Sequence, residues 1–108
     1  MPIQLSFEDM EWETPTRGYY LTDVKQKTLW VNEETGATWA LIKFPPGLAD
    51  KTHIHSKANQ LICPLTGPDA GKVAQITLKG EPHGGADIKE EIIALFYWDG
   101  PPDPEVVE

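Results

Sequence analysis

The stretch GLADKTHIHSKANQLICPLTG, residues 47–67, decides the fold of this chain because it carries two histidines on one predicted strand. His53 and His55 are two residues apart, and alternate residues of an extended strand point to the same face of a sheet. Together with His83, in the sequence KGEPHGG, they are the entire histidine content of the chain. Imidazole is a common ligand of zinc, copper, iron and nickel. The pattern therefore predicts a metal site in which His53 and His55 supply two ligands from one strand. His83 supplies a third ligand from a neighbouring strand or loop.

The segments around this stretch predict an all-β chain, because glycine and proline interrupt the sequence every few residues and long helical periodicity is absent. Residues rich in β-branched and aromatic side chains indicate strands at 28–32, 37–44, 51–55, 60–65, 72–78 and 90–98. Short strands with this spacing are typical of a β-sandwich or barrel. For residues 87–98 a helix is the alternative, although Ile92 and Ile93 favour a strand.

The length predicts a single domain over residues 1–108, with its core at about 28–101. Residues 6–12 are expected to hold a short helical turn. The acidic, proline-rich tail 101–108 is expected to be either flexible or an edge or partner arm.

The formal net charge of −8 disfavours binding to nucleic acid or to an anionic membrane, because both are negatively charged. No apolar run approaches the roughly 20 residues of a membrane span, and the acidic N-terminal sequence lacks signal-peptide features. We therefore expect a cytoplasmic protein with no nucleic-acid or membrane partner. The single cysteine, Cys63, excludes an internal disulfide and is expected on the strand face opposite Gln60.

Two spacings resemble the conserved motifs of the cupins. The first is Gly47, five residues, His53, one residue, His55, four residues, Gln60, six residues and Gly67. Glutamate is usual in that motif where this chain has Gln60.

The second spacing is Gly80, two residues, His83, three residues and Asp87, with asparagine usual at the place of Asp87. The surrounding sequence, over roughly residues 28–101, looks most like small single-domain cupins of the acetylacetone dioxygenase type.

The resemblance implies a cupin-type β-sandwich or jelly-roll barrel that holds one divalent metal ion. The implied ligands are His53, His55, His83 and Gln60, where Gln60 either ligates directly, hydrogen-bonds to a metal-bound water, or does neither. Fe²⁺ is favoured, with Zn²⁺, Ni²⁺, Mn²⁺ and Cu²⁺ as alternatives. Asp87 is expected to be a turn or surface residue.

A neutral ligand set leaves about two positive charges on the site, against about one with a glutamate ligand, so the expected substrate is anionic or metal-chelating. The resemblance implies a non-haem iron dioxygenase-like enzyme that acts on a small enolisable or diketone-type compound. The alternatives are a metal-dependent isomerase, lyase or cyclase acting on a sugar acid or other carboxylate, and a non-catalytic metal-binding or ligand-binding sensor. A homodimer is expected because a small sandwich has exposed edges.

Several aromatic residues could contact the pocket of such a site. Among the four tryptophans, most are expected in the core or an interface, and Trp39 is the preferred pocket residue. Tyr19, Tyr20 and Tyr97 are candidates for a polar pocket contact. The strand predicted at 37–44 can have either of its two faces toward the interior. Either Trp39 and Leu41 or Ala40 and Ile42 would then face inward.

Overall fold

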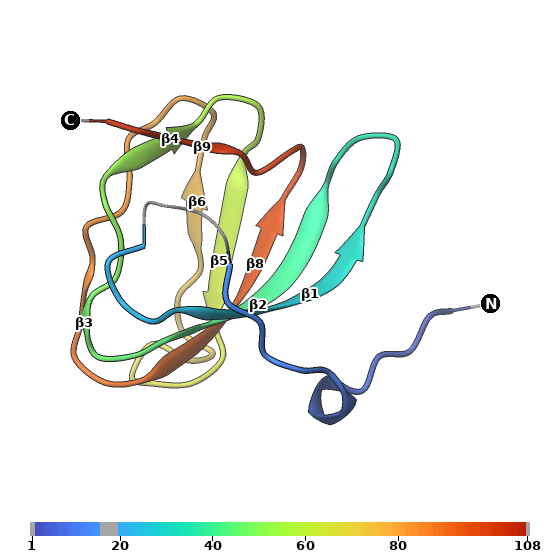
Figure 1. The fold of residues 1–108 in the computed structure, drawn as a ribbon, viewed down its shortest axis with the longest axis horizontal. Helices are drawn as coiled ribbons and strands as arrows, with labels where there is room; N and C mark the ends of the chain where they lie inside the picture. Colours follow the sequence, from blue (N-terminus) through green and yellow to red (C-terminus); the bar gives the residue numbers. More distant parts are fainter. Residues whose placement is uncertain (1, 16–19, 108) are drawn as a thin grey trace.

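The computed structural model describes residues 2–15 and 20–107, in which β-strands make up nearly all of the regular structure (Figure 1). One antiparallel sheet has five strands in the order β1-β2-β8-β5-β6. Their bounds are β1 Lys25–Val31, β2 Thr38–Phe44, β5 Gln60–Pro64, β6 Gln75–Thr77 and β8 Ile92–Trp98. The all-β sandwich predicted from the sequence is confirmed, and residues 92–98 form a strand rather than a helix.

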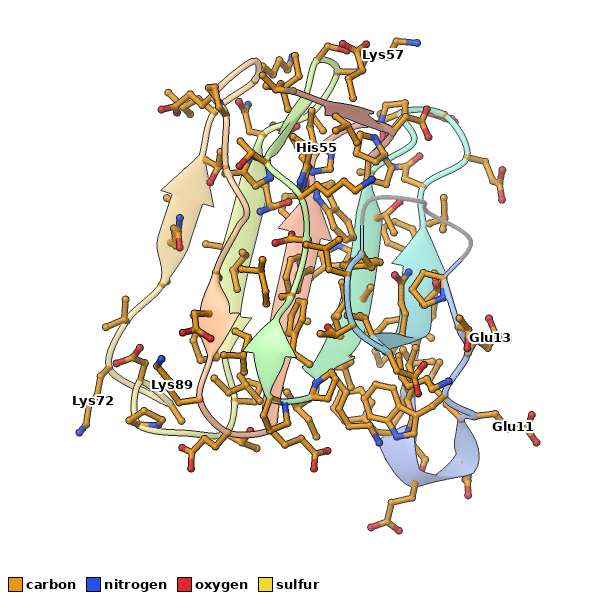
Figure 2. The ribbon with its side chains drawn as sticks, turned by 60° about the vertical axis from the view of Figure 1, so that its left-hand side comes forward. Glu11, Glu13, His55, Lys57, Lys72 and Lys89 are labelled. Carbon is orange, nitrogen blue, oxygen red and sulfur yellow. The ribbon has the colours of Figure 1, made fainter. Side chains whose placement is uncertain are left out.

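Two short ribbons lie across from this sheet and close the sandwich (Figures 1 and 2). They pair β3 with β7 and β4 with β9. Their bounds are β3 Gly47–Leu48, β4 His53–His55, β7 Asp87–Ile88 and β9 Pro104–Val106. The acidic tail therefore forms an edge strand against the histidine strand, which is one of the two alternatives expected for it.

The sequence pattern missed some elements and overextended others. The strands β3 and β7 have two residues each, too few to show an alternating pattern. The strand expected at 72–78 is shortened to β6, because the backbone N–H groups of Lys72 and Val73 donate to the carbonyl of Asp69 in a turn. The helical turn expected within residues 6–12 is the 3-10 helix η1, Phe7–Asp9.

The core lies between the five-stranded sheet and the ribbons. Its buried side chains come from alternate positions of β2 and β8, including Ala40, Ile42, Ala94, Phe96 and Trp98. Strand β2 therefore turns Ala40 and Ile42 inward, which settles the two orientations that the sequence left open. Ile42 and Trp98 have no exposed surface.

The outer face of the same sheet has its own contacts. The rings of Trp39 and Tyr97, on neighbouring strands, have centroids 4.3 Å apart. The N-terminal segment crosses β1 and β2, where the Trp12 ring lies 4.5 Å from the Lys27 ammonium and 4.6 Å from that of Lys43. Cation–π contacts of this kind attach the segment to the sheet.

Within residues 2–15 and 20–107, no helix has the length and apolar character needed to cross a lipid bilayer.

We expect Ile42→Ala to lower the free energy of unfolding by about 2–5 kcal/mol, because truncation of a fully buried side chain loses apolar burial and leaves a cavity. The matched control is Ile3→Ala at a side chain that is 75% exposed, with an expected change below about 0.5 kcal/mol. Urea unfolding followed by circular dichroism measures both values. Equal losses at the two positions would contradict the assigned core.

Candidate metal centre

The three histidines converge at one point inside the sandwich. Two of them lie on β4 and are buried, each only 2% exposed, while His83 lies in the segment before β7 and is half-buried. One potential ligand atom from each ring lies within 4.8 Å of those of the other two. The ring centroids are separated by 5.0 Å for His53 and His55, 4.3 Å for His53 and His83, and 4.9 Å for His55 and His83. Figure 2 shows His55 pointing into the space between the ribbons and the sheet.

The backbone itself joins two of these residues. His53 and His83 form an isolated antiparallel bridge, in which each donates its N–H to the carbonyl of the other at 2.8 and 2.9 Å. Such a doubly hydrogen-bonded pair fixes the spacing of the two residues. The position of the third histidine, His55, is set by strand β4, on which it shares a face with His53.

Each imidazole also makes the same backbone hydrogen bond through Nδ1. The carbonyl oxygens of Lys51, Glu81 and Pro102 lie 2.6, 3.1 and 3.2 Å from Nδ1 of His53, His83 and His55, respectively. A carbonyl can only accept, so in each case Nδ1 carries the proton and Nε2 carries the lone pair. This is the arrangement that orients histidine ligands in metalloproteins.

The donor set fits a divalent cation. Three neutral imidazoles supply nitrogen lone pairs that suit first-row metals, and His83 Nε2 is buried with no hydrogen-bond partner among the described residues. A buried polar atom of this kind carries a desolvation penalty unless a ligand satisfies it. His53, His55 and His83 could therefore hold one metal ion through Nε2.

Gly84 provides the close approach that brings His83 to β4. Its φ is +104°, and a Cβ there would lie 2.7 Å from the Lys51 carbonyl oxygen and 3.1 Å from His53 Nδ1. The next residue, Gly85, donates its N–H to Oδ1 of Asp50 at 3.0 Å. Burial raises the pKa of the Asp50 carboxyl, although His53 and this hydrogen bond act in the opposite direction.

Gln60 lies in the same cavity and is 4% exposed. Its Oε1 accepts a hydrogen bond of 2.7 Å from Nε1 of Trp98, the residue directly opposite it on β8. The indole of Trp98 in turn lies 6.2 Å from the ring of His55, centroid to centroid. Trp98, rather than Trp39, is therefore the tryptophan nearest the histidine cluster, because its strand position faces inward.

The cavity has a volume of about 240 Å³ and is largely apolar. Ile62, Ala94 and Phe96 line its sheet side, and the polar groups come from Asp50, His53, Gln60, Gln75 and His83. Among the described residues, its lining contains no lysine or arginine. The cavity therefore suits a small, mainly apolar molecule with a few polar atoms that reach the histidines.

An amide–carboxylate clamp next to Gln60 was not predicted from the sequence. Asn59 donates through its backbone N–H and its Nδ2 to the two carboxylate oxygens of Asp99, at 2.7 and 2.8 Å. Desolvation of the Asp99 carboxyl raises its pKa, but the hydrogen bonds from Asn59 outweigh this effect and leave the pKa below its ordinary value. The clamp joins the start of β5 to the end of β8, and so supports the pairing of Gln60 with Trp98.

The remaining candidates lie in different places. Tyr20 lines the cavity. Tyr97 and Trp39 instead contact each other on the outer face of the sheet, so the pocket role predicted for Tyr97 and Trp39 is wrong. Tyr19 lies outside the described residues. Asp87 is exposed and pairs with Lys89, as expected for a surface residue.

Cys63 lies outside the cavity on β5, on the face opposite Gln60. This agrees with the period-two prediction and separates the thiol from the histidines.

Comparison with known proteins identifies the architecture. The chain matches no family model and no curated protein, but solved structures match it. The polyketide cyclase RemF from Streptomyces resistomycificus aligns with a TM-score of 0.74 and 15% identity, over 100% of this chain and 87% of that one. One chain from the complex of Rhodobacter sphaeroides SigE with the anti-sigma factor ChrR aligns with a TM-score of 0.64 and 24% identity. That match covers 87% of this chain and 52% of the matched chain.

An acetylacetone dioxygenase-type protein from Methylibium petroleiphilum aligns with a TM-score of 0.56 and 15% identity, over 100% of this chain and 82% of that one. The fold thus places the chain in the class of small β-sandwich proteins, with the histidine cluster in its interior. A cupin-like protein is also among the matches, and the protein has the cupin fold, with acetylacetone dioxygenases among its structural neighbours.

Gly84→Ala should disrupt the centre, because its Cβ would overlap the carbonyl that orients His53. Gly80→Ala is the matched control, since φ is also positive there, at +77°, but a Cβ would meet nothing within 4 Å. Both variants carry the backbone strain of about 1 kcal/mol, and only Gly84→Ala should also lower Zn²⁺ affinity, by at least about tenfold. Calorimetric titration with Zn²⁺ measures the difference. Equal affinities in the two variants would show that Gly84 does not position the histidines.

Proposed function

We propose that this protein is a metal-dependent enzyme of the non-haem iron dioxygenase-like kind, acting on a small enolisable compound of the diketone type. His53, His55 and His83 hold one divalent ion, for which Fe²⁺ is favoured. The observation that carries the proposal is the shared Nδ1 hydrogen bonding of the three clustered imidazoles, which leaves Nε2 as the lone-pair atom of each neutral ring, beside an apolar cavity that His53 and His83 line.

The charge of such a site supports an anionic chelating substrate. Neutral ligands leave about two positive charges on a bound divalent ion, and an apolar environment weakens the screening of that charge. A β-diketonate supplies two oxygen atoms that can chelate one ion, together with a small apolar remainder. The absence of lysine and arginine from the described lining disfavours a sugar acid, whose carboxylate and hydroxyl groups need more polar partners.

The metal ion, when bound, supplies Lewis acidity for enolisation and, if it is iron, electrons for reaction with dioxygen. The chain's own residues orient the ligand and exclude water. Ile62, Ala94 and Phe96 form the apolar wall that contacts the carbon skeleton of the substrate. The three carbonyl acceptors favour the tautomer in which Nε2 of the neutral imidazole carries the lone pair that a metal requires.

A cyclase is the second candidate, supported by the alignment of a polyketide cyclase over the whole of this chain. A polyketide with alternating carbonyl groups contains the same enolisable unit as a diketone, so both candidates begin with activation of the same C–H bond. The two differ in their need for dioxygen. A lyase or isomerase belongs to the same oxygen-independent class.

A non-catalytic sensor is the third candidate, because a chain from a complex between a sigma factor and its anti-sigma factor is among the structural neighbours. In this case metal or ligand binding would raise the melting temperature without turnover of any substrate.

The test is an oxygen-electrode measurement with Fe²⁺-loaded protein and a panel of β-diketones that includes acetylacetone. We expect oxygen consumption that depends on both iron and diketone, and His53→Ala should reduce it to background because one ligand is lost. Turnover of a polyketide or diketone by the Zn²⁺-loaded protein without oxygen would favour the cyclase. No uptake across the panel would contradict the dioxygenase proposal.

We also propose that the protein forms a homodimer through the β6 edge of the five-stranded sheet. Strand β6 ends the strand order and exposes 68% of Ile76. An exposed edge strand with an apolar side chain favours pairing. Light scattering should give twice the mass of one chain, and Ile76→Lys should halve it. A monomeric wild-type protein would contradict the proposal.

A further inference from the structure

We infer that Gln60 is a hydrogen-bond donor to the ligand rather than a fourth metal ligand, and that Trp98 holds its amide in the donating orientation. In this role Nε2 of Gln60 donates to the anionic oxygen of a chelating molecule in the cavity. The inference rests on the proposed metal site and identifies the residue that makes it selective for an anion.

The orientation of the Gln60 amide follows from the chemistry of its partner. The indole Nε1 of Trp98 carries a hydrogen and can only donate. The atom 2.7 Å from it must therefore be the carbonyl oxygen of the amide, since the reversed amide would place two donors against each other. Both residues are buried, Gln60 at 4% and Trp98 at 0% exposure, so this hydrogen bond does not compete with bulk water.

The amide nitrogen is consequently directed away from the indole. Gln60 lines the cavity together with His53 and His83, and no described residue accepts a hydrogen bond from its Nε2. Amide donors next to an apolar wall are costly unless a ligand satisfies them. The available acceptor is therefore a molecule in the cavity, which is water before a ligand binds and the ligand once it is bound.

Strand pairing supports this arrangement. Gln60 and Trp98 are direct Cα partners in the β5–β8 ladder, and side chains of opposed residues on one face lie next to each other. The clamp between Asn59 and Asp99 holds the adjacent pair of residues. The amide is thus positioned from two sides before any ligand binds, which is the preorganisation that favours binding of negative charge.

The amide also accounts for the choice of glutamine over glutamate. A carboxylate at position 60 would accept from Trp98 equally well, but it would repel an anionic oxygen and offer it no donor. Glutamine keeps the acceptor for the indole and adds a donor for the ligand. The pair Gln60–Trp98 therefore selects an anionic oxygen such as that of an enolate.

The experiment uses Co²⁺-loaded protein, with acetylacetone as the probe and the visible absorption of cobalt as the readout. Gln60→Met fills a similar volume without donor or acceptor. We expect it to retain the wild-type cobalt content and affinity, and to raise the Kd for acetylacetone about tenfold, as for the loss of one hydrogen bond to a charged group.

Trp98→Phe tests the positioning role, with Trp39→Phe on the outer face as its matched control. We expect Trp98→Phe to raise the Kd several-fold, because the amide can then rotate, and Trp39→Phe to leave it unchanged. In the double variant of Gln60→Met and Trp98→Phe, the Kd should be no higher than in Gln60→Met alone, since both changes remove one contact. A merely structural effect of Trp98 would instead add to that of Gln60.

Three outcomes overturn the inference. A tenfold or greater loss of cobalt affinity in Gln60→Met would make Oε1 a metal ligand, while the proposed metal site would stand. An unchanged Kd for acetylacetone would remove the donor role. Failure of the wild-type protein to bind cobalt would refute the metal site itself, and the inference with it. If Gln60→Met does not fold, Gln60→Glu replaces it, with the same expected weakening of acetylacetone binding.

Discussion

The doubly hydrogen-bonded backbone pair of His53 and His83 is the constraint on which the rest of this structure depends. It joins the two segments that carry the candidate ligands, and it does so at the ligand residues themselves. Gly84 has to be a glycine because the segment then passes within van der Waals distance of the Lys51 carbonyl. The ribbons β3–β7 and β4–β9 frame this contact and hold it across from the sheet. The geometry of the site is therefore set by main-chain hydrogen bonds rather than by side-chain packing alone.

The electrostatic character of the site follows from the same backbone. Each imidazole donates through Nδ1 to a carbonyl, which leaves Nε2 as the lone-pair atom of the neutral ring, and the apolar wall from β5 and β8 limits the screening of charge by water. Neutral ligands would not offset the charge of a cation held here, so the cation would attract an anionic ligand strongly. This combination favours small chelating anions over extensively hydroxylated acids, and it supports the diketone and polyketide proposals over the sugar-acid one.

The sequence allowed the histidine cluster to be predicted because two strong local rules apply to it. Residues two apart on a strand share a face, and the motif spacing around His53, His55 and His83 resembles that of the cupins. The strands β2 and β8 were predictable for a similar local reason, since each is a seven-residue run rich in β-branched and aromatic residues, and β5 is a five-residue, mainly apolar run. The sequence did not show whether the tail 101–108 is flexible or forms an edge or partner arm. Its pairing with β4 shows that it forms an edge strand.

The sequence by itself determined the all-β architecture, the grouping of His53, His55 and His83, and the opposite orientation of Gln60 and Cys63 on β5. Only the tertiary structure decided which face of β2 is internal, that Trp98 rather than Trp39 lies near the histidines, and which atom of Gln60 the indole contacts. The physical reason is the range of the interactions. Strand periodicity and ligand chemistry are local, whereas sheet order, cross-strand partners and amide orientation depend on residues far apart in the chain.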